Sequence, residues 1–208
     1  MLNLQTALSF FGVSLLLGLT PGPDNVFVLL QSASYGKRAG MLVVLGLCGG
    51  LVVHTTAIAL GLAEVFAASQ TAFVVLKFAG AAYLAYLAWQ AFTAPVAGSD
   101  TASVPALQPR QLLVRGMVMN LTNPKVVFFF LAFLPQFVDA TRGAVAWQLA
   151  QLGGIFILAT LLSFGAISYF AASVGQRLRG SARAQAWLNR VAGTVFAGLA
   201  LRLAVAQR

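Results

Sequence analysis

Asp24 and Lys125 are two charged residues that lie deep inside long apolar stretches of this chain, and each directly follows a proline. The first stretch is interrupted by Leu-Thr-Pro-Gly-Pro-Asp-Asn at 19–25, and the second by Asn-Leu-Thr-Asn-Pro-Lys at 120–125. A charge near the centre of a bilayer costs about 2.5 to 3.5 kcal/mol on insertion scales, so such residues are usually paired, functional or in contact with a wet cavity. One acid and one base could together hold the ammonium and the carboxylate of a zwitterion, and the acid could also carry a proton.

The composition places the chain in a membrane. Of the 208 residues 60% are hydrophobic and only 8% are charged, and the mean hydropathy is +0.88. Soluble domains have about 25% charged residues, so we predict an all-α integral membrane protein with a single transmembrane domain over 1–208. The net charge of +9 does not indicate a nucleic-acid partner, because the basic residues fall mostly in short connections between apolar segments. That pattern orients a membrane protein in the lipid bilayer.

Six apolar segments are long enough to cross about 30 Å of hydrocarbon as helices, which takes about 20 residues. They cover approximately 6–34, 39–63, 71–92, 112–137, 145–173 and 186–206. A polar stretch rich in Ala, Ser, Thr and Pro separates the third segment from the fourth. The chain therefore divides into a first half at about 4–93, a linker at about 94–111 and a second half at about 112–206.

The two halves resemble each other in sequence. Pro23 and Asp24 in the first segment correspond to Pro124 and Lys125 in the fourth. At a constant offset, Gly49, Gly50 and Thr56 correspond to Gly153, Gly154 and Thr160. Because each half has an odd number of spans, three, the second half enters the membrane in the opposite orientation to the first. Inverted repeats with broken helices are typical of secondary transporters, which bind substrate at the midplane.

Basic residues predict the orientation of these spans. The connections on one side contain Lys37, Arg38, Arg110, Arg115, Arg177, Arg179, Arg183 and Arg190, whereas the other side has Arg142, with Arg202 and Arg208 at the tail. The more basic side is expected to face the cytoplasm. In a bacterial inner membrane this would put both termini on the periplasmic side.

The first break is expected to start a half-helix. Pro21, Gly22 and Pro23 interrupt the helix, because proline lacks an amide donor and clashes with the preceding turn. Thr20 could cap a new half-helix that starts at Pro21. Asp24 would then lie in the first turn, where the helix dipole favours an acid.

The second break predicts the same geometry with the opposite charge. Asn123 could cap a half-helix that starts at Pro124, which places Lys125 at the positive end of a helix dipole, where a cation is disfavoured. An anionic group is therefore expected nearby, either Asp24 or the carboxylate of a bound substrate. Uncharged hydrogen-bonding groups around the two charges are Asn25, Asn120, Asn123, Thr20 and Thr122.

Two interpretations of Asp24 and Lys125 remain open. They could bind a substrate, or they could form a buried ion pair that only fixes the packing of the two halves. Pairing at rest and opening for a substrate are compatible.

Other residues give weaker signals. Thr160, Ser163 and Ser168 could line a path or bond their own backbone. Gly46 and Gly50 form a small-residue face that predicts close helix packing. With one cysteine, Cys48, and one histidine, His54, the chain has no ligand set for a soft metal, and we expect neither a metal nor a cofactor.

These motifs resemble the lysine exporter family, the LysE/RhtB group of bacterial amino acid exporters. The resemblance rests on the segments 20–23, 80–84, 120–125 and 133–137, and it covers nearly the whole chain. It implies export of amino acids or close derivatives across the inner membrane, driven by the proton motive force, and it marks Pro21, Gly22, Pro23, Asn120, Asn123, Pro124 and Lys125 as motif positions. The single deep acid, Asp24, favours a neutral or small polar amino acid over a dibasic one.

The sequence also bears on two other classes of function. An intramembrane enzyme is not expected, because the sequence has no His-Glu-x-x-His motif and no second deep aspartate to form a dyad with Asp24. A lipid-handling or assembly protein with the same broken helices remains an alternative. The sequence leaves open whether the protein forms a homo-oligomer.

Overall fold

The computed structural model describes residues 2–20, 22–61, 70–93, 108–178 and 182–205, and all regular structure in these ranges is helical. Pro21 and the linker residues 94–107 lie outside the described residues. The helices are α1 (Leu4–Leu19), α2 (Pro23–Tyr35), α3 (Lys37–Ala59), α5 (Gln70–Thr93), α6 (Pro109–Thr122), α7 (Pro124–Phe128), α8 (Val145–Leu178) and α9 (Ala182–Val205). After α7 come a π-helical turn, η1 (Phe129–Phe133), and two 3₁₀ turns, η2 (Leu134–Phe137) and η3 (Ala140–Arg142).

Both helix breaks fall where the prolines predicted them. The axes of α1 and α2 differ by 64°, and α6 is bent by 54° from the helical run Pro124–Phe137. Among the described residues, α3 and the Val145–Ser173 part of α8 are each long and apolar enough to cross a membrane, and each bent pair qualifies when it is taken as one span. The described chain thus has two to four candidate spans, in agreement with an integral membrane protein.

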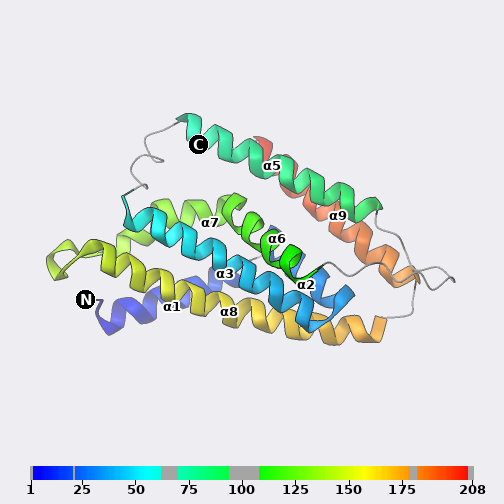
Figure 1. The fold of residues 1–208 in the computed structure, drawn as a ribbon, viewed down its shortest axis with the longest axis horizontal. Helices are drawn as coiled ribbons and strands as arrows, with labels where there is room; N and C mark the ends of the chain where they lie inside the picture. Colours follow the sequence, from blue (N-terminus) through cyan, green and yellow to red (C-terminus); the bar gives the residue numbers. More distant parts are fainter. Residues whose placement is uncertain (1, 21, 62–69, 94–107, 179–181, 206–208) are drawn as a thin grey trace.

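The helices form a layered bundle (Figure 1). The long helices α5 and α9 lie side by side along one flank, apart from the layer that contains α1, α3 and α8. In that layer α3 packs against both α6 and α8, and α8 also packs against α1 and α2. Four side chains of α3 are completely buried, namely Val43, Val44, Leu47 and Leu51. Helix α3 is therefore the centre of the core, and it contacts α2 from the first break and α6 from the second.

Close packing of α3 on α6 depends on two glycines, in agreement with the prediction of a small-residue face. A Cβ atom on Gly46 would collide with the backbone carbonyl of Leu113 and lie 3.0 Å from the Cα of Gly116. One turn further along α3, a Cβ on Gly50 would lie 2.6 Å from Oδ1 of Asn120. The absence of side chains on these glycines lets α6 approach α3 and holds Asn120 in place.

We expect Gly46→Ala to lower the melting temperature of the purified protein. The added methyl group meets backbone atoms, which cannot move aside as a side chain can, and overpacking of this kind costs about 1 to 3 kcal/mol. Gly154→Ala in α8 is the matched control, because nothing lies within 4 Å of its Cβ position and alanine favours a helix over glycine by about 1 kcal/mol. Thermal unfolding of both variants in detergent checks this. Equal melting temperatures would show that the α3–α6 contact is not this close.

Candidate functional site

At the first break the structure corrects the predicted capping. Helix α2 starts at Pro23 with Gly22 as its N-cap, not at Pro21. Thr20 does not cap α2, because its backbone N–H and its hydroxyl both donate to the carbonyl of Leu16, at 2.9 and 2.8 Å. Thr20 therefore closes α1. Pro23 occupies the first position of α2, where no amide donor is needed.

The end of α1 leaves carbonyl groups without helical partners, and side chains from both breaks satisfy them. Asn25 Nδ2 donates to the carbonyl oxygen of Gly18 at 2.7 Å. The ammonium of Lys125 donates to the carbonyl oxygens of Leu17 at 3.1 Å and Thr20 at 2.9 Å. Unpaired backbone groups are costly where no water is present, so these contacts explain how the chain can be broken here. They also tie the first break to the second.

The partner of Lys125 is thus the C-terminal end of α1. The negative end of a helix dipole attracts a cation, which resolves the unfavourable position of Lys125 near the start of α7. Asp24 and Lys125 do not form a direct ion pair, since in the described part of the chain the ion pair found is Asp139 with Arg142. The third contact of the Lys125 ammonium is long, 3.5 Å to Oδ1 of Asn25.

The second break matches the prediction from the sequence. Asn123 caps α7 by accepting a hydrogen bond from the backbone N–H of Lys125 at 3.0 Å, and Pro124 takes the first helical position. The hydroxyl of Thr122 donates to the carbonyl of Val118 at 2.9 Å, within its own helix. Nε2 of His54 lies 3.5 Å from the carbonyl oxygen of Asn120, so the His54 side chain contacts the backbone near the end of α6.

Three buried polar atoms between the breaks have no hydrogen-bond partner. They are Oδ1 of Asp24, Oδ1 of Asn120 and Nδ2 of Asn123. Asp24 lies in the first turn of α2, as predicted, and is only 2% exposed. The side chains of Asn123 and Asp24 are neighbours, but Oδ1 of Asp24 and Nδ2 of Asn123 do not meet the geometry of a hydrogen bond. Buried polar groups are nearly always paired, so this cluster is a candidate binding site.

A small cavity lies between these polar groups and the surrounding helices. Its lining includes one acid, one base and one amide, from Asp24, Lys125 and Asn120. The other lining residues are Leu17, Gly18, Leu47, Val126, Phe156, Thr160 and Phe164. The cavity measures about 10 Å³, which is room for about one water molecule. In this conformation the cavity has no room for an amino acid, so a larger molecule would require the breaks to separate.

The predicted site residues divide into three groups. Asp24, Asn120 and Lys125 line the cavity, and Asn123 and Asn25 contact two of them. The hydroxyls of Thr20 and Thr122 are bound to their own helices, and neither residue lines the cavity.

Thr160 of α8 lines the cavity, as one of the two sequence interpretations allowed, but Phe156 and Phe164 beside it were not predicted. Phe156, Thr160 and Phe164 follow one another at intervals of four, which places them on one face of a helix and could have indicated that α8 forms a wall of the cavity. Metal binding receives no support from the described residues, in which no group of three His, Cys, Asp or Glu side chains comes together.

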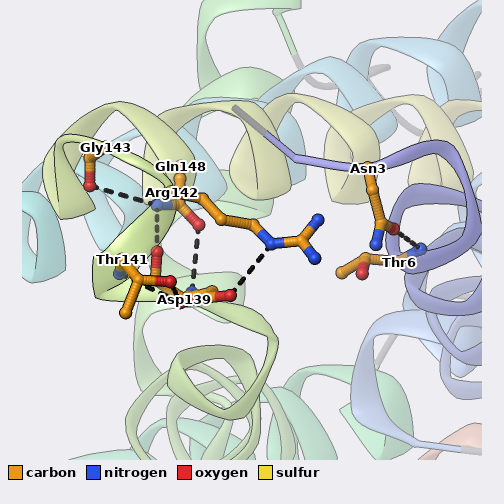
Figure 2. A network of polar contacts seen from close by, with 7 residues as sticks. All are labelled: Asn3, Thr6, Asp139, Thr141, Arg142, Gly143 and Gln148. Carbon is orange, nitrogen blue, oxygen red and sulfur yellow. Dashed lines mark hydrogen bonds and ion pairs between the residues drawn. The ribbon is translucent and has the colours of Figure 1, made fainter.

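The polar network at the start of α8 lines no part of this cavity (Figure 2). Asp139 accepts hydrogen bonds from the backbone N–H and the hydroxyl of Thr141 and from Nε of Arg142, at 2.6 to 2.9 Å. The bonds from Thr141, and secondarily Arg142, hold the pKa of the Asp139 carboxyl below its ordinary value. Gln148, 1% exposed, donates to the carbonyls of Asp139 and Gly143. These contacts fix the connection into α8, so we assign them a structural role.

The chain is similar to known membrane proteins over nearly its whole length. The sequence profile of the LysE type translocators matches residues 10–207. An uncharacterized membrane protein of Vibrio cholerae is 30% identical over 207 residues, which is 99% of this chain and 100% of that protein. A homoserine/homoserine lactone efflux protein of Salmonella typhimurium is 33% identical over 185 residues, 88% of each chain. The uncharacterized membrane protein YrhP of Bacillus subtilis is 28% identical over 96% of this chain and 98% of its own. No solved structure matches.

Proposed function

This chain belongs to the LysE type translocator family, and from this we propose that it is a proton-driven secondary exporter of amino acids or their close derivatives. Members of such a family are membrane transporters, so the protein is not an enzyme. The observation that carries the proposal is the cavity between the two breaks. It combines a buried acid and a base with polar atoms that no protein group satisfies.

The two charges suit the two ends of an amino acid. In our proposal Asp24 receives the ammonium group, and its unpartnered Oδ1 is the acceptor. Lys125 receives the carboxylate, which replaces the long 3.5 Å contact to Asn25 while the two contacts to α1 remain. Asn120 and Asn123 add an acceptor and a donor beside them. The Salmonella relative is named for efflux of homoserine and its lactone, and homoserine is a zwitterion of this class.

Alternating access would occur between two inverted halves of three spans each. The packing supports this arrangement, because the second helix of each half packs against the broken helix of the other, α3 on α6 and α8 on α1 and α2. The third helices, α5 and α9, pack on each other. Both breaks, at 64° and 54°, occur in the first helix of a half. The small cavity would then belong to a state between the two openings.

We propose the inner membrane as the location, with both termini in the periplasm. Helices α3, α6 and α9 begin, and α8 ends, at one end of the bundle (Figure 1). This end carries Lys37, Arg38, Arg110 and Arg183, and a basic end is expected to face the cytoplasm. Helix α1 begins at the opposite end. Export would therefore run from the basic end towards the end shown in Figure 2.

Countertransport in proteoliposomes tests the proposed function. Liposomes loaded with a labelled neutral amino acid should release it faster when the same amino acid is added outside, and an imposed proton gradient should drive net movement. Protein-free liposomes and a protonophore are the controls. If no amino acid exchanges, and a fluorescent lipid crosses the bilayer instead, the lipid-handling alternative would replace this proposal.

A further inference from the structure

Helix α8 forms one wall of the cavity with three side chains. Phe156, Thr160 and Phe164 are buried, at 4 to 5% exposure, and all three line the same cavity as Asp24 and Lys125. Their spacing of four residues stacks them along one face of the helix. If the charged ends of an amino acid lie against Asp24 and Lys125, its side chain has this wall as a neighbour.

The Thr160 hydroxyl differs from the buried serine hydroxyls of the described residues. Ser14, Ser32 and Ser163 each donate to the carbonyl four residues earlier, at 2.6 to 2.8 Å, and Ser168 donates to the carbonyl of Lys37 at 3.4 Å. Thr56, the counterpart of Thr160 in the first half, also bonds its own helix. Within the described part of the chain Thr160 makes no such bond, and its side chain lines the cavity. An unused donor and acceptor in a buried cavity points to a ligand group.

The charges of the lining limit the kind of side chain that fits. The lining residues carry one acid and one base, which the ammonium and carboxylate of an amino acid would use. A charged side chain would have no opposite charge left, and burying an unpaired charge is costly. Two aromatic rings flank Thr160 on the same helix face, so the wall offers apolar contact with one hydrogen-bonding position.

We propose that Phe156, Thr160 and Phe164 form a side-chain subsite that selects short, uncharged, hydroxyl-bearing amino acids, with Thr160 as the specificity-determining residue. This inference rests on the proposed function and names the substrate class of the same site. The Thr160 hydroxyl exchanges a hydrogen bond with the substrate hydroxyl, while the flanking rings limit the length of the side chain.

The test uses substrates that differ only in the hydroxyl. L-threonine and L-valine have the same shape, and their relative exchange rates in proteoliposomes give a ratio that does not depend on how much protein is folded. The wild type should prefer threonine. Thr160→Val should reduce the threonine-to-valine ratio about 5- to 10-fold, the value of one hydrogen bond to a neutral partner, and Thr160→Ser should keep it.

Thr55→Val is the matched control, because Thr55 on α3 already bonds the carbonyl of Leu51 and does not line the cavity. It should leave the ratio unchanged. An unchanged ratio in Thr160→Val would overturn the inference, and so would an equal fall in Thr160→Ser, which would assign the effect to packing. A wild type that exchanges both substrates equally overturns the subsite but leaves the exporter proposal standing. A wild type that exchanges no amino acid overturns both.

Discussion

Replacing Lys125 with methionine should reduce amino acid export by about 30-fold or more, since truncating one partner of a charge pair that the bound substrate buries costs about 2 to 5 kcal/mol. Methionine has a similar length and no charge, so the substrate carboxylate would lose its cation. The carbonyls of Leu17 and Thr20 would lose a donor as well. Lys125 therefore has two roles, holding α1 against α7 and, in our proposal, binding the substrate.

Lys125→Arg separates these two roles. Its guanidinium keeps the positive charge and offers five donors, so the contacts to α1 can form again and the protein should remain folded. We expect partial export from the arginine variant and almost none from the methionine variant. The measurement is countertransport per amount of protein that elutes as a single species from size exclusion. Full export by Lys125→Met would remove Lys125 from the site.

Asp24→Asn should abolish export and at the same time leave the protein as stable as the wild type or more stable. Oδ1 of Asp24 is buried without a partner, and a buried charge that is not fully paired destabilises the fold. Asparagine has the same shape without the charge, so it removes the cost of burying a charge. Export should fall about 100-fold, because the substrate ammonium would lose its charged acceptor.

The melting temperature and the exchange rate of Asp24→Asn are measured on the same preparation. Substituting a residue that is kept for stability would lower both the melting temperature and the exchange rate. Substituting a residue that is kept for binding lowers only the exchange rate. A fall in melting temperature larger than that of Gly46→Ala would instead assign Asp24 to the packing of the two halves.

Local chemistry allowed the breaks to be predicted from the sequence. Prolines end helices for steric reasons that do not depend on the rest of the fold, so the start of α7 at Pro124, its cap at Asn123 and the place of Asp24 in a first turn were all correct. The start of α2 at Pro23 instead of Pro21 was missed, because the choice between two nearby prolines depends on how α1 ends. Thr20 can serve either helix, and the structure assigns it to α1.

Long-range features could not be predicted. The partner of Lys125 is a set of backbone carbonyls at the end of α1, and backbone groups have no signature in a sequence. The Thr160 hydroxyl stands out only because it lacks the helix bond that neighbouring hydroxyls make. The contacts of Lys125 join residues more than 100 positions apart, and the place of Thr160 in the cavity depends on how α8 packs.

The central claim is that Asp24 takes the ammonium of the substrate and Lys125 takes its carboxylate. It is tested most directly by the ligand-induced rise in melting temperature with three ligands of one shape, namely L-threonine, L-threoninamide and 2,3-dihydroxybutyrate. The amide lacks the carboxylate, and the hydroxy acid lacks the ammonium. The wild type should be stabilised by threonine far more than by the other two. The Asp24→Asn variant should no longer prefer threonine over the hydroxy acid. The Lys125→Met variant should no longer prefer threonine over the amide. If both variants keep the wild-type ranking, or if each loses the opposite preference, the assignment of the two charges is contradicted.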